Sequence, residues 1–88
     1  MVLIRKKITV KNKQGLHARP AALFVQTANR FNARITVRKD NEEVNGKSIM
    51  GILTLGAHRG SQIVIEADGE DASLAISELE KIITKEEE

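Results

Sequence analysis

The only proline of this chain, Pro20, fixes the start of a helix beside a potentially nucleophilic side chain. Proline is favoured in the first turn of a helix, where its missing N–H has no partner, so this helix should begin at about Ala18 or Arg19. Gly15 marks a turn just upstream, and His17 then falls at or near the N-cap. The positive end of the helix, with its unpaired N–H groups, would hold an anion attached to His17. Arg19 adds a planar cation beside it.

Hydrophobic periodicity predicts seven short elements in the order strand, helix, strand, strand, helix, strand, helix. Alternation with period two predicts strands over residues 3–11, 34–38, 43–45 and 62–67. Helical spacing predicts helices over residues 18–29, from residue 49 to a stop at Gly56, and over residues 72–83. Glu70 and Asp71 lie at the start of the last helix, where the helix dipole favours acids. This order fits an α+β fold, an open-faced β-sandwich in which a four-stranded antiparallel sheet carries three helices on one face.

Composition limits what such a chain does. Eighty-eight residues with 41% hydrophobic content suit one small domain over residues 1–88. The absence of cysteine excludes disulfides, thiolate catalysis and Cys-based zinc sites, and two separated His without clustered carboxylates argue against any metal site. No apolar run reaches the roughly 20 residues of a membrane span, and no signal-peptide h-region is apparent, so the expected protein is soluble, cytoplasmic and not inserted in a membrane.

Charge predicts an acidic partner. The net charge is +2, basic residues crowd the N-terminal end, and Glu86, Glu87 and Glu88 close the chain. Nucleic acid would also suit a basic surface, but two Phe are the only aromatics, and base-stacking modules depend on aromatic platforms. The sequence also lacks the Gly-x-x-Gly loop of KH-type RNA-binding modules. RNA binding is therefore a minor alternative, and no nucleic-acid partner is expected.

Three segments together resemble the HPr family of histidine-containing phosphocarrier proteins. They are GLHARP at residues 15–20, AALFVQTA at residues 21–28 and GKSIMGILTLG at residues 46–56. The resemblance covers nearly the whole chain and implies the same open-faced sandwich. It further implies a carrier of the phosphoenolpyruvate-dependent sugar phosphotransferase system, which is not an enzyme. No cofactor is expected, and a monomer is expected although the sequence itself leaves the oligomeric state open.

The resemblance implies specific roles at the helix start. The phosphoryl group arrives on Nδ1 of His17 from enzyme I, itself charged by phosphoenolpyruvate, and leaves to sugar-specific permease components of the EIIA type. Arg19 stabilises the charge in transfer, and Ala18 and Pro20 belong to the helix N-terminus at the phosphate. The main rival is a small α/β acyl-phosphate hydrolase, which also holds phosphate with an Arg near a helix N-terminus but has no need of a nucleophilic imidazole. His58 lies in a loop and is given no role.

The resemblance also implies regulation like that of Gram-positive carriers. Ser48 is expected to cap the short helix and to be phosphorylated by HPr kinase/phosphorylase, which promotes binding to the catabolite control repressor. The presence of His17 argues against the catabolite-repression paralogue, which lacks this residue. Gly46 departs from the Ala expected there. A docking surface for partners is expected from Leu23, Gln26, Ile49, Met50 and Leu53, although Leu23 alone also suits an ordinary exposed position.

Overall fold

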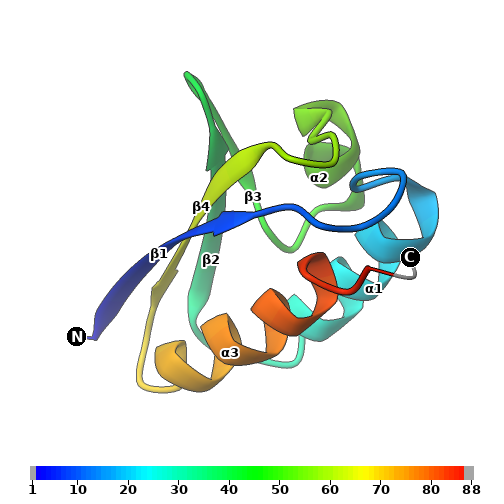
Figure 1. Cartoon of the computed structure of the whole chain (residues 1–88). Helices are drawn as coiled ribbons and strands as arrows, with labels where there is room; N and C mark the ends of the chain where they lie inside the picture. The colour runs from blue at the N-terminus through cyan, green and yellow to red at the C-terminus, as the bar shows by residue number, and fades with distance from the viewer. Residues whose placement is uncertain (1, 87–88) are drawn as a thin grey trace.

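The computed structural model describes residues 2–86 as seven elements in the predicted order. The strands are β1 (Leu3–Thr9), β2 (Arg34–Lys39), β3 (Glu42–Asn45) and β4 (Gln62–Asp68). The helices are α1 (Ala18–Ala28), α2 (Ile49–Leu55) and α3 (Ala72–Ile83). In Figure 1 the three helices lie on one side of the sheet, whose other side is left uncovered.

The sheet has the order β1-β4-β2-β3, and every neighbouring pair is antiparallel. Strand β4 therefore lies between β1 and β2, which pair with it through Ile8–Ile63 and Val37–Ile65 respectively. Because side chains alternate across a strand, β2 and β4 turn Ile35, Val37, Ile63, Ile65 and Ala67 toward the helices, where all five are buried. The α+β open-faced sandwich predicted from the sequence is confirmed.

The core lies between this sheet face and the helices. Phe24 of α1 and Leu79 and Ile83 of α3 are fully buried, as is Ile52 of α2. Helix α1 packs against both α2 and α3. Helix α1, whose N-terminus carries the predicted site, is thus held in place by contacts with two other helices.

Most boundaries agree with the predictions to within two residues. Strand β1 ends at Thr9 rather than Lys11 because Thr9 pairs with Gln62, the first residue of β4. The acid at the start of α3 has a role beyond the helix dipole. Asp71 is the N-cap residue but makes no side-chain cap bond, and no acid lies in the first turn. Its carboxylate instead accepts hydrogen bonds from the backbone N–H groups of Asn32 and Ala33, at 2.8 and 2.9 Å.

Gly46 has a steric reason that the sequence does not reveal. A Cβ added there would lie 2.5 Å from Cγ2 of Ile35, a core residue of β2, and the Gly46 N–H donates to the Ile35 carbonyl at 2.8 Å. An Ala at this position would require Ile35 to move. The glycine thus permits the close approach of the segment before α2 to the sheet.

Candidate functional site

His17 is the N-cap residue of α1, as the position of Pro20 predicts. Its backbone is extended, with φ −81° and ψ −169°, and its carbonyl accepts the Ala21 N–H at 2.9 Å as the first bond of the helix. The side chain makes no capping hydrogen bond and is partly exposed. Since the imidazole is not used to hold the helix end, it remains available for chemistry at that end.

Two segments distant in sequence meet just before His17. The Leu16 N–H donates to the Ala57 carbonyl at 2.9 Å, and Gly15 has the left-handed φ of +73°. A Cβ at Gly15 would lie 2.4 Å from the Ala57 oxygen and 2.9 Å from Cα of His58. Glycine is therefore required here for two reasons, the backbone conformation and the contact with the segment after α2.

The first turn of α1 supplies the other residues predicted at the phosphate. Arg19 and Ala18 are exposed, whereas Pro20 is buried beneath them. The first N–H groups of a helix have no partner within the helix and carry partial positive charge. His17 and Arg19 thus lie together at the positive end of an 11-residue helix.

Ser48 caps α2, as the sequence predicts. Its Oγ accepts the Gly51 N–H at 3.1 Å, and Gly56 ends the helix in the left-handed conformation with φ of 64°. Ser48 itself is partly exposed. The prediction that Ser48 caps α2 is confirmed. Because its hydroxyl acts as the acceptor in this bond, its own proton can still be donated to another group.

The five residues predicted for docking are all exposed and come from the two neighbouring helices α1 and α2. They are Leu23, Gln26, Ile49, Met50 and Leu53. Met50 is the most exposed, at 65% of its full area. An apolar patch of this kind, uncovered in the chain alone, is the type of surface that a partner protein covers. We call these five residues the α1–α2 surface.

The segments that carry this surface and His17 contain no acidic residue. Neither residues 1–39 nor residues 44–65 include an Asp or a Glu. The cations of residues 10–31 and 46–61 are Lys11, Lys13, Arg19, Arg30, Lys47 and Arg59. The described acids lie instead around the β2–β3 turn, in β4, around the start of α3, in α3 itself and at Glu86, after α3. The segments of the sequence that carry His17 and this surface are therefore cationic and apolar.

Two features of the site were missed from the sequence. The segment holding Ala57 and His58 lies against Gly15, whereas the sequence suggested only a loop unrelated to the site. Asn12 is completely buried, although a turn residue is usually exposed. A signal for Asn12 was present, because it continues the inward-facing series of Ile8 and Val10 at period two.

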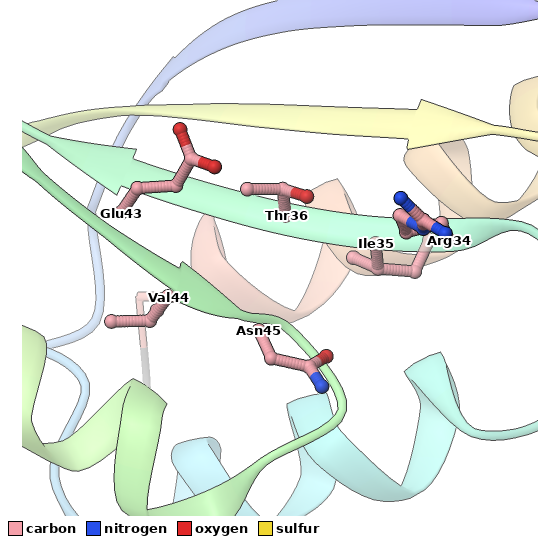
Figure 2. Close-up of a pocket in the computed structure, with 6 residues that line it drawn as sticks. All are labelled: Arg34, Ile35, Thr36, Glu43, Val44 and Asn45. Atoms are coloured by element: carbon pink, nitrogen blue, oxygen red, sulfur yellow. The ribbon is translucent and has the colours of Figure 1, made fainter.

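Other parts of the described chain offer little chemistry. A hollow of about 300 Å³ lies along β2 and β3, lined by the residues drawn in Figure 2, none of which belongs to the predicted site or the α1–α2 surface. Residues 2–86 contain no group of three or more His, Asp or Glu arranged to hold a metal ion. Within the same residues, no helix combines the length and apolar character needed to cross a membrane.

Comparison with known proteins identifies the family. Residues 4–85 match the family model described as the PTS HPr component phosphorylation site. The HPr-like protein Crh of Halalkalibacterium halodurans is 48% identical over 96% of this chain and 100% of its own length. The crystal structure of phosphocarrier protein HPr from Bacillus anthracis is 48% identical and has a TM-score of 0.90, covering 94% of this chain and 99% of that one.

A further structure bears on assembly. The crystal structure of an HPr dimer from Thermoanaerobacter tengcongensis is 54% identical, with a TM-score of 0.74 over 92% of this chain and 94% of that one. A dimer among such near relatives leaves the expected monomer unconfirmed.

The hydrolase and RNA-binding alternatives find no support among these relatives. HPr proteins carry a phosphoryl group and are not enzymes, and with this fold, this helix start and these relatives the chain belongs to the HPr family of phosphocarrier proteins.

Proposed function

We propose that this chain accepts a phosphoryl group on His17 from enzyme I and passes it to sugar-specific permease components. The observation that carries the proposal is the placement of His17 at the N-cap of α1 with its imidazole unused for capping. A ring nitrogen attacks phosphorus, so that a P–N bond forms as the bond to the donor group breaks. The reverse exchange with an acceptor releases the phosphoryl group, and the protein returns unchanged.

The helix start is suited to hold the group while it waits. Backbone N–H groups at the positive end of α1 receive a phosphate anion, and Arg19 offers a charged planar donor from the first turn. No positioned water is needed for such a relay, since the acceptor protein supplies the next nucleophile. The chain itself therefore needs only to store a labile phosphoramidate in a fixed place.

The direct test is mass spectrometry of the protein after incubation with enzyme I and phosphoenolpyruvate. One phosphoryl group is expected on His17, lost in acid and retained in alkali, because protonation of the nitrogen breaks the P–N bond. Incubation with acetyl phosphate alone tests the rival hydrolase and should show no turnover. Multiple turnovers of acetyl phosphate would refute the carrier proposal.

Replacing Arg19 by Ala should slow phosphoryl transfer to His17 by about tenfold to a hundredfold, because a charged donor at the transferring group is lost. The melting temperature should change little, since exposed charged side chains contribute about 0–1 kcal/mol to stability. Arg34→Ala, at an exposed position in β2, is the matched control and should keep the wild-type rate. Equal rates for the two variants would remove Arg19 from the site.

We further propose that the α1–α2 surface is the docking site for enzyme I and the permease components. Its apolar residues adjoin segments that carry cations and no acids, so a partner with an acidic rim around an apolar groove fits it. Methionine suits a surface that accepts several partners, because its flexible side chain adapts to different shapes.

Leu53→Glu is expected to weaken binding to enzyme I at least tenfold without unfolding the protein. The reason is that Leu53 is 39% exposed and a carboxylate there would oppose an acidic partner. The matched control is Leu74→Glu, since Leu74 is exposed on α3, away from this surface. Calorimetric titration measures both affinities. An unchanged affinity for Leu53→Glu would refute the docking surface, and unfolding would show that Leu53 is a core residue.

Regulation at Ser48 completes the proposal. Phosphorylation by an HPr kinase/phosphorylase would place about −1.5 to −2 charges beside Ile49 and Met50 of the docking surface. That charge would hinder an acidic enzyme I and would favour a basic partner, for which family resemblance indicates the catabolite control repressor.

We also propose that the carrier acts in the cytoplasm as a monomer, a state that sedimentation analysis would distinguish from the dimer seen in a relative.

A further inference from the structure

Asn12 is a fully buried amide in the segment that leads to His17. Its side-chain Nδ2 donates two hydrogen bonds, to the carbonyl of Ile82 at 2.9 Å and to the carbonyl of Lys85 at 3.0 Å. Its Oδ1 is buried and, within residues 2–86, is the only such side-chain atom without a partner. A rotated amide would direct Oδ1 at the two carbonyls, so the acceptors fix the orientation of the side chain.

The Ile82 carbonyl belongs to the last turn of α3, whose last residue is Ile83, and the Lys85 carbonyl lies just beyond the helix. The final carbonyl groups of a helix have no partner within it, and they form its negative end. The neighbouring Lys11 N–H donates to the Ile83 carbonyl at 2.8 Å, so residues 11 and 12 together bind two carbonyls of the last turn and the Lys85 carbonyl that follows the helix. Figure 1 shows the end of α3 beside the loop that enters α1.

A continuous series of hydrogen bonds connects this contact to His17. The Asn12 carbonyl accepts the Gly15 N–H at 3.0 Å, and the Gly15 carbonyl accepts the His17 N–H at 2.9 Å. On its other side the same loop is held by the Leu16 bond to Ala57. Because the His17 imidazole makes no capping bond, its placement depends on this backbone. Asn12 fixes the first residue of the series.

We infer that Asn12 is a positioning residue for the phosphoacceptor. Its amide attaches the loop before His17 to the negative end of α3 through two donated hydrogen bonds. These bonds offset the cost of burying Oδ1 without a partner. An apolar residue at this inward-facing position would fill the same space but make neither side-chain bond, so that only backbone bonds would hold the loop. The inference rests on the proposed phosphorylation of His17.

The test compares wild type with Asn12→Leu, which has a similar volume and removes the unpaired oxygen together with both donors. Phosphorylation by enzyme I and phosphoenolpyruvate is followed by rapid quenching, and kcat and the KM for the carrier are determined. Asn12→Leu should lower kcat at least fivefold with KM within twofold, because the surface for docking is untouched. Ile65→Val, in the middle of β4, provides a small core destabilisation far from the loop and should keep the wild-type kcat.

A second measurement compares hydrogen exchange in the wild-type protein and in Asn12→Leu. Hydrogen exchange of the Asn12 side-chain amide, observed by NMR, should be much slower than that of exposed Asn41, and in Asn12→Leu the Gly15 and His17 amides should exchange faster than in wild type. A wild-type kcat for Asn12→Leu, or an Asn12 amide that exchanges as fast as that of Asn41, would overturn the inference. Failure of the wild type itself to be phosphorylated would instead overturn the proposed function.

Discussion

His17→Ala is expected to abolish phosphorylation by enzyme I and phosphoenolpyruvate. The variant removes the only imidazole at the start of α1 and leaves no other nucleophile in the described first turn, where Ala18, Arg19 and Pro20 follow. The fold should persist, because the His17 side chain makes no cap bond and the helix bond to Ala21 uses the backbone. Acid-labile phosphate, measured after a fixed incubation, should fall to background.

His58→Ala is the matched control for this variant. His58 is the other histidine of the chain, and its backbone lies beside Gly15, yet it is outside the helix start that would hold a phosphate. Its replacement should leave the stoichiometry at one phosphoryl group per chain. Acid-labile phosphate remaining on His17→Ala and disappearing on His58→Ala would reverse the assignment of the two histidines.

Ser48→Asp is expected to slow phosphorylation of His17 by at least tenfold, whereas Ser48→Ala should leave the rate at the wild-type value. A carboxylate at this position brings negative charge to the edge of the α1–α2 surface, and a docking penalty of about 1.4 kcal/mol is a tenfold loss of affinity. The helix should tolerate it, because Asp is as good an N-cap residue as Ser. The effect is measured as the initial rate of phosphorylation by enzyme I, at carrier concentrations below the KM of enzyme I for the carrier.

Stability distinguishes this effect from damage to α2. Ser48→Ala loses the bond from Gly51 and should cost about 1 kcal/mol, which for a domain of this size lowers the melting temperature by about 4–8 °C. Thus the less stable variant should be the active one and the more stable variant the slow one. Three equal rates, together with repressor binding that ignores phosphorylation of Ser48, would leave this serine as a helix cap alone.

The elements were predictable because each contains a clear periodicity. The apolar series from Ala72 to Ile83 predicts α3 with its observed bounds, and the paired signals of Gly15 and Pro20 place His17 at the N-cap of α1. Strand ends were less predictable, since they depend on the partner strand. Thus β4 extends to Asp68 because that residue pairs with both Leu3 and Arg34.

The contacts that support the site were not predictable from local patterns. The bonds of Asn12 to the end of α3 join residues 70 and 73 positions apart, and the approach of Ala57 to Gly15 joins the segments before α1 and after α2. Composition and spacing report what a segment does with its neighbours in sequence. They do not report which distant backbone atoms will lie within hydrogen-bonding distance.

The absence of acids from the sequence segments around His17 has an electrical consequence. The chain carries a net charge of +2, and a phosphoryl group would bring on the order of −2 at neutral pH. Loading the carrier would therefore cancel nearly all of its net charge, and it would do so in a segment that carries cations and no acids. An acidic donor would attract the empty carrier and lose that attraction once transfer is complete, so the phosphoryl group itself would favour release of the product.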